Sequence, residues 1–254
     1  YLVMEYLENG SLLDLINSNN PTSYLYGIQS SDSNQSNNLN QPESLFTKIS
    51  NNNFLDEDTV RKFFVQLIVA LDFLHHDQHI AHRDIKLENV ILDRYNNIRI
   101  IDFGLSAILT DESESLKTTV GSIAYSAPEI LMKKKYSKSA DIWSAGVILY
   151  TLATSKLPFL DLTDEISYAN VDNAKYGVLN DPAKICNMIL HGHLEIPTNL
   201  SENLQDLIPK MLERDPHKRI TIQNIIEHPW FSKEQYTMLL DFVESQDKIE
   251  NIDL

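Results

Sequence analysis

Four polar residues of the types that handle phosphate and metal ions lie in the segment "IAHRDIKLENVILDRYNNIRIIDFGLSA", residues 80–107. The carboxylate of Asp102 and the carboxamide of Asn89 offer hard oxygen ligands of the kind that Mg²⁺ prefers. Asp84 can accept a hydrogen bond from a substrate hydroxyl, and the ammonium group of Lys86 can neutralise a phosphate. Any one of these residues alone could simply cap a strand, but the whole set at this spacing predicts a phosphoryl-transfer site.

Short apolar runs must hold these polar residues in place. Ile, Val and Leu on both sides of Asn96-Asn97 predict two short strands joined by a turn. Gly104 allows the backbone to turn sharply behind Asp102. Upstream, "LDEDTVRKFFVQLIVALDFLHH" (55–76) has helical apolar spacing and acidic residues at its start. Downstream, "SADIWSAGVILYTLATS" (139–155) is apolar on nearly every face and predicts a helix buried at the centre of an α-rich domain.

The remaining segments alternate between helical and polar patterns. Residues 17–53 contain ten Asn and eight Ser but only three charged side chains, which predicts a disordered insertion. Residues 161–181 read as a second polar insertion. Residues 232–254 form an acidic C-terminal tail that is either a solvated helix or disordered. Further helices are expected at "SLLDLI", "PAKICNMIL", "SENLQDLIPKMLERD" and "TIQNIIEHPWF".

Charge and composition narrow the range of partners. The chain has 254 residues and a net charge of −15, so binding to nucleic acid or to an anionic membrane surface is not expected. The longest apolar stretch, "IWSAGVILYTLA", is too short to span a bilayer. The single cysteine, Cys186, cannot form an internal disulfide, which favours a reducing, intracellular and cytoplasmic location.

Three motifs resemble those of the eukaryotic protein kinases. "HRDIKLEN" resembles the catalytic loop, "DFG" at 102–104 the metal-binding motif and "APE" at 127–129 the end of the activation segment. The lysine two residues after Asp84 resembles the serine/threonine type, and "GSIAYSAPE" with "EHPWF" is similar to the calmodulin-dependent and AMP-activated group. The resemblance implies an α+β, mainly α-helical fold: the C-terminal lobe of a kinase, with small β-hairpins and a buried central helix.

The resemblance also implies a role for each residue of the quoted segment. Asp84 is expected to be the catalytic base and Lys86 to contact the γ-phosphate of ATP. Asn89 and Asp102 are expected to hold Mg²⁺. Ser122 is expected to approach Asp84 and Lys86.

Other positions are expected by the same resemblance to bind the nucleotide. Met4 matches the gatekeeper, and residues 5–7, including Glu5 and Leu7, match the hinge whose backbone meets adenine. Ile91 matches the floor of the adenine pocket. Ser11 stands where many of these kinases have a glutamate that contacts ribose and a basic substrate residue, so a preference for basic substrates is in doubt.

Structural and regulatory positions complete the comparison. Asp141 is expected to anchor the backbone of the catalytic loop, and Arg219 to form a buried ion pair with Glu129. Thr118 lies where related kinases are phosphorylated by an upstream activating kinase, and a phosphate there could pair with Arg83. Thr119 is a rival site, and an ordinary exposed threonine is the alternative for Thr118.

The resemblance covers most of residues 1–231, as a partial kinase domain that begins at the hinge. The family's N-terminal lobe, with its Gly-rich loop and strand lysine, is expected to be absent, so the isolated chain should be weakly active or inactive. Two functions follow: a kinase acting on Ser/Thr of protein substrates within a longer chain, or a non-catalytic kinase-like scaffold. A zinc site using His76 and His79 is a weaker alternative, because no further ligands at structural-site spacing are evident.

Overall fold

A computed structural model of the chain describes residues 9–19, 55–108, 122–134, 137–159 and 182–240. The predicted positions Met4, Glu5, Leu7, Thr118 and Thr119 lie outside the described residues. Most of the predicted insertion at 17–53, the second polar insertion and the last fourteen residues also lie outside them. The predictions made for these segments, and for the N-terminal lobe, therefore stay predictions.

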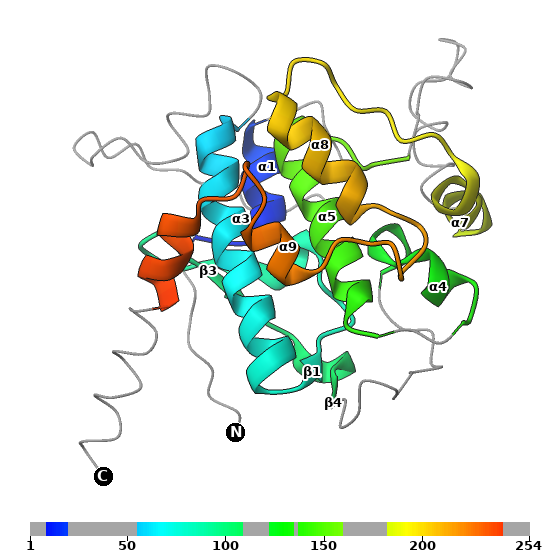
Figure 1. The fold of residues 1–254 in the computed structure, drawn as a ribbon, viewed down its shortest axis with the longest axis horizontal. Coiled ribbons are helices and arrows are strands. Elements are labelled where there is room, and N and C mark those ends of the chain that lie inside the picture. Colours follow the sequence, from blue (N-terminus) through cyan, green and yellow to red (C-terminus); the bar gives the residue numbers. More distant parts are fainter. Residues whose placement is uncertain (1–8, 20–54, 109–121, 135–136, 160–181, 241–254) are drawn as a thin grey trace, which may run out of the picture.

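Packed helices form the core of the molecule, and α5 lies at its centre, in contact with both α3 and α8 (Figure 1). Every residue of α5 except Ser139 and Ala153 is buried, which confirms the predicted central helix. No helix in the described part of the chain is both long and apolar enough to cross a bilayer. The core helices are α3 (Glu57–Asp72), α5 (Ser139–Thr154), α8 (Glu202–Met211) and α9 (Ile222–Ile226).

The N-terminus of α3 begins where the acidic residues predict it. The Asp56 side chain accepts hydrogen bonds from the Thr59 N–H at 2.9 Å and the Thr59 hydroxyl at 2.7 Å, an N-cap that satisfies a free backbone donor. After Asp72 the helix widens into a π-helical turn, Phe73–Asp77. The buried side chains of α3 face the core.

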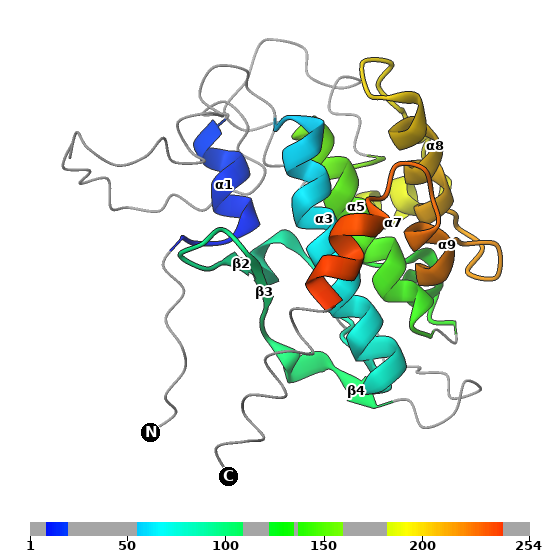
Figure 2. The same ribbon diagram turned by 60° about the vertical axis from the view of Figure 1, so that its left-hand side comes forward.

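Two small antiparallel sheets of two strands each lie beside these helices (Figure 2). β2 (Val90–Leu92) pairs with β3 (Ile98–Ile100), and β1 (Ile80–Ala81) pairs with β4 (Ala107–Ile108). The β2–β3 turn confirms the predicted turn, since Asn96 adopts a left-handed conformation with φ of 59°. The β1–β4 pairing therefore brings the start and the end of the segment 80–108 together.

Residues 9–11 add a further backbone connection to the β2–β3 hairpin. The N–H of Leu92 donates to the carbonyl of Gly10 at 2.8 Å, and Ser11 forms an antiparallel bridge with Ile91. α1 (Leu12–Asn19) follows directly. The helix continues through Asn19, beyond residue 17, where the polar composition begins, because helical backbone bonds extend from an anchored turn without needing apolar side chains.

The predicted acidic tail begins with ordered structure. Residues 233–240 are helical. Leu239 packs against the hydrophobic core, and the Tyr236 hydroxyl donates to Asp72 at 2.5 Å. The first part of the tail is thus a helix docked beside α3.

A buried ion pair links the segment after residue 122 to the C-terminal helices. Both terminal nitrogens of Arg219 donate to the Glu129 carboxylate, at 2.7 and 2.9 Å, and both side chains are almost fully buried. Arg219 also donates to the Ser139 carbonyl at 2.8 Å. The structure therefore confirms the predicted Glu129–Arg219 pair.

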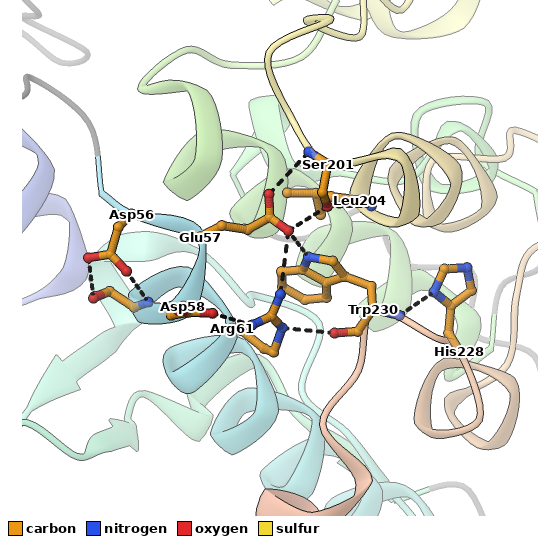
Figure 3. Close-up of polar contacts among 9 residues, drawn as sticks. Asp56, Glu57, Asp58, Arg61, Ser201, Leu204, His228 and Trp230 are labelled. Carbon is orange, nitrogen blue, oxygen red and sulfur yellow. Dashed lines mark hydrogen bonds and ion pairs between the residues drawn. The ribbon is translucent and has the colours of Figure 1, made fainter.

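A second polar cluster joins the N-termini of α3 and α8 to Trp230 (Figure 3). The Glu57 carboxylate accepts from the Ser201 hydroxyl at 2.5 Å and from the Trp230 indole at 2.6 Å. Arg61 lies over the Trp230 ring and donates to its carbonyl at 2.9 Å. Because Glu57 is the first residue of α3, these contacts hold the end of α3 nearest the Asn/Ser-rich segment.

Replacing Arg219 by methionine should destabilise the fold by about 3–5 kcal/mol, because it leaves the buried Glu129 carboxylate without a partner. Urea unfolding measures the loss. The matched control is Lys218→Met, since Lys218 is exposed and its pairing distance to Asp215 is 3.9 Å; that change should cost less than about 1 kcal/mol. The double variant Glu129→Met/Arg219→Met should recover part of the loss, and equal losses for Arg219→Met and Lys218→Met would contradict this account.

The Glu57 cluster should make stability depend on pH. Burial alone acts to raise the pKa of Glu57, but the hydrogen bonds from Ser201 and Trp230 outweigh it and lower the pKa. The stabilisation is therefore present above the unfolded pKa of about 4.3 and is lost as pH falls through the lower folded value. Glu57→Gln should be less stable than the wild type at pH 7. The difference in the free energy of unfolding between the two, measured with urea, is the gap that should close towards pH 3. Glu202→Gln, an exposed carboxylate in α8, should show a smaller gap; a Glu57 gap that is constant with pH would disprove the assignment.

Candidate functional site

Three polar residues of the segment 84–89 form one hydrogen-bonded cluster around the Asp84 carboxylate. The Lys86 ammonium donates to Asp84 at 2.7 Å and to the Ser122 hydroxyl at 3.2 Å. The Asn89 amide donates to the Asp84 carboxylate at 3.1 Å and to its carbonyl at 2.9 Å. The backbone N–H of Ser122 donates to the other carboxylate oxygen at 3.1 Å. The structure thus brings together Asp84, Lys86, Asn89 and Ser122.

Alternating apolar residues explain why these side chains converge. Ile85 and Leu87, which flank Lys86, are fully buried in the hydrophobic core. Removing them from water anchors the loop from below. A short 3₁₀ turn, Leu87–Asn89, then brings Asn89 back towards Asp84. The loop is therefore held by apolar burial on one side and by hydrogen bonds on the other.

The backbone of Ile101, the residue before Asp102, is hydrogen-bonded to this part of the chain and holds Asp102 beside the cluster. The Ile101 N–H donates to the Asn89 carbonyl at 3.0 Å, and the Ile101 carbonyl accepts from the His82 ring at 3.1 Å. Asp102 itself adopts a left-handed conformation with φ of 63° and accepts from the Gly104 N–H at 3.2 Å. Within the described residues, no hydrogen bond joins the Asp102 side chain to Asp84 or Asn89.

The free oxygen atoms at this site fit a hard cation. The Asn89 amide nitrogen is committed to Asp84, while its Oδ1 makes no hydrogen bond within the described part of the chain. Asp102 is exposed, and only its Oδ1 accepts a bond there. A carboxylate and an amide oxygen that are otherwise uncommitted suit Mg²⁺, which keeps several waters and needs few protein ligands.

Two of the predicted nucleotide-binding residues are neighbours in space. Ser11 and Ile91 form the bridge that attaches residues 9–11 to β2. The Ser11 hydroxyl donates to Asp14 at 2.7 Å, and the Asp14 carboxylate accepts the Ser11 N–H at 2.8 Å. The Asp14 N–H donates in return to the Ser11 hydroxyl oxygen at 3.2 Å, which makes a reciprocal capping interaction at the start of α1, so the Ser11 hydroxyl is already engaged.

The backbone of the catalytic loop is held by Asp141. Its carboxylate accepts from the N–H groups of His82 and Arg83, both at 2.9 Å, and from the His75 ring at 2.8 Å. Burial acts to raise the pKa of Asp141, but these hydrogen bonds and the charge of His75 lower it below its usual value. The carboxylate is thus kept as an acceptor of three hydrogen bonds.

The sequence analysis did not single out His75, which is nevertheless a partner of Asp141. Its ring is 3% exposed and pairs with Asp141, whereas the neighbouring His76 is exposed and contacts Asp72. The available signal was the position of His75 at the end of a strongly apolar helix, where a buried polar ring needs a hydrogen-bond partner. Arg83, predicted to meet phosphorylated Thr118, donates through its side chain to the Leu105 carbonyl.

Comparison with known proteins agrees with the motifs and the geometry. The family model for the protein kinase domain matches residues 24–231. The chain is 40% identical over 210 residues to an SNF1-related protein kinase catalytic subunit alpha, KIN12, of Arabidopsis thaliana, covering 81% of this chain and 38% of that protein. It is 40% identical to CBL-interacting protein kinase 1 of Oryza sativa subsp. japonica, covering 80% and 40% of the two chains.

A fungal relative is similar to a comparable extent. The chain is 37% identical over 204 residues to the carbon catabolite-derepressing protein kinase of Candida glabrata, covering 80% of this chain and 29% of that protein. The chain thus spans less than half the length of these relatives. The family match over most of the chain, together with the motifs around Asp84 and Asp102, shows that the chain belongs to the protein kinase family.

Proposed function

We propose that the protein containing this chain transfers the γ-phosphate of ATP to serine or threonine hydroxyls of protein substrates. The observation that carries the proposal is the cluster of Lys86, Asn89 and Ser122 around the Asp84 carboxylate. A non-catalytic scaffold has no physical need for a buried carboxylate with three donors beside free metal-binding oxygens. The serine/threonine kinases among the relatives support the same activity.

Asp84 would accept the proton of the attacking hydroxyl. Its carboxylate is 6% exposed and is oriented by the Ser122 N–H, the Asn89 amide and Lys86, so little reorganisation is needed when the hydroxyl arrives. Lys86 lies between Asp84 and Ser122 and would place its positive charge beside the transferred phosphoryl group.

Asn89 and Asp102 would hold Mg²⁺ through the oxygens that are not already hydrogen-bonded. When bound, Mg²⁺ neutralises charge on the phosphates. Ile91 would contact the adenine from β2, with Ser11 beside it. Met4, Glu5 and Leu7 complete the proposed nucleotide site.

Replacing Asp84 by asparagine should reduce kcat by about 10²–10⁴-fold in the full-length protein that contains this chain, because the hydroxyl loses its proton acceptor. A radiolabelled-ATP assay measures the turnover, and a thermal melt checks that the fold is intact. Asp58→Asn is the matched control, since the Asp58 side chain is 89% exposed. Normal turnover in Asp84→Asn would refute the assignment of the base.

We further propose that an upstream kinase regulates the protein by phosphorylating Thr118. A phosphate could form charge-assisted hydrogen bonds with Arg83, which the loop holds in a left-handed conformation with φ of 69°. Thr118→Ala should therefore lower the kinase activity more than Thr119→Ala does, as measured by peptide phosphorylation with full-length protein purified from cells that contain the upstream kinase. Equal activities of the two variants would contradict the choice of Thr118.

A further inference from the structure

The π-helical turn at the end of α3 carries a buried histidine that the proposed chemistry does not use. π-Helical turns are rare and often occur at functional sites. In this turn, Phe73–Asp77, His75 is 3% exposed while the side chain of His76 is 64% exposed. The turn thus separates two adjacent histidines, sending one into the protein and one towards solvent.

Both the ring and the backbone carbonyl of His75 form hydrogen bonds with residues at the start of α5. Its ring Nε2 donates to Asp141 Oδ2 at 2.8 Å. Its backbone carbonyl accepts a hydrogen bond from the Lys138 ammonium, and Lys138 is the residue immediately before α5. Two independent contacts therefore fix where the ring lies relative to Asp141.

The Asp141 carboxylate, which His75 orients, also binds the backbone of the catalytic loop. Oδ2, which accepts from His75, also accepts from the His82 N–H at 2.9 Å, and Oδ1 accepts from the Arg83 N–H at 2.9 Å. Arg83 has a positive φ of 69°, a conformation that a residue with a side chain adopts at a cost and keeps only when its surroundings hold it. Asp84 is the next residue along the chain.

We propose that His75 is a positioning residue for Asp84. It orients the Asp141 carboxylate, which holds the backbone amides of the two residues that precede Asp84. The proposal rests on the assignment of Asp84 as the catalytic base. His75 lies behind the loop and acts only through Asp141.

The physical basis is the need of a buried carboxylate for donors. Burial acts to raise the pKa of Asp141, and the bond and charge of His75 are the largest influences that lower it. Without His75, Oδ2 keeps one donor, so the carboxylate either rotates or takes up a proton. In both cases one of the two loop amides loses a well-placed acceptor, and Arg83 is no longer held in its left-handed conformation.

Two amide side chains separate the positioning role from simple filling of space. The amide nitrogen of glutamine can occupy the place of histidine Nε2, whereas that of asparagine matches Nδ1 and falls short of Asp141. In the full-length protein, His75→Gln should keep kcat within about threefold, and His75→Asn should lower it at least tenfold with KM for ATP changed less than twofold, because small displacements of a reacting group cost rate. His76→Asn, on the exposed side of the same turn, is the control and should leave kcat unchanged.

Amide hydrogen exchange gives a readout that does not need activity. His75→Asn should speed exchange at His82 and Arg83 while leaving the α5 core protected, and His75→Gln should exchange like the wild type. Equal exchange and equal kcat for the Gln and Asn variants would overturn the proposal, as would an Asn variant that unfolds or loses protection throughout the core. If the wild type transferred no phosphate, the kinase proposal would fail, while the exchange rates would still test the role of His75.

Discussion

A carboxylate that is almost completely buried must find donors inside the protein, and Asp141 finds three. Its two oxygens hold the backbone of His82 and Arg83 and the ring of His75. Because a buried charge without partners costs several kcal/mol, these bonds are difficult to break one at a time. The backbone of the loop at His82 and at the left-handed Arg83 is held by this one carboxylate.

The same helix also positions the other side of the site. The Ser144 hydroxyl of α5 donates to the carbonyl of Tyr125 at 2.8 Å, and the carbonyl of Ser139 accepts from Arg219, which pairs with Glu129. Asp84 and Ser122 therefore meet because both of their segments are bound to the first turns of α5. A helix buried on nearly every side is well suited to this task, since it cannot shift without opening the core.

The proposed chemistry depends on a division between apolar and polar side chains within a few residues. Ile85 and Leu87 are buried, which leaves Asp84, Lys86 and Asn89 to bond with one another. The oxygens of Asn89 and Asp102 that make no such bond among the described residues are the ones that the proposed function assigns to Mg²⁺. The site is thus largely preorganised. The oxygen atoms that accept no hydrogen bond within it are left for a bound ligand.

The sequence by itself determined the central helix, the acidic start of α3, the β2–β3 turn and the identity of the motif residues, because these follow from local periodicity and from short spacings. It also predicted the Glu129–Arg219 pair and the anchoring role of Asp141, through resemblance to the protein kinases. Only the tertiary structure decided the partner of His75, the Glu57 cluster, the docking of the helix at 233–240 and the extension of α1 to Asn19. His75 and Asp141 are 66 residues apart and Glu57 and Trp230 are 173 apart, and such contacts depend on how the helices pack rather than on any local pattern.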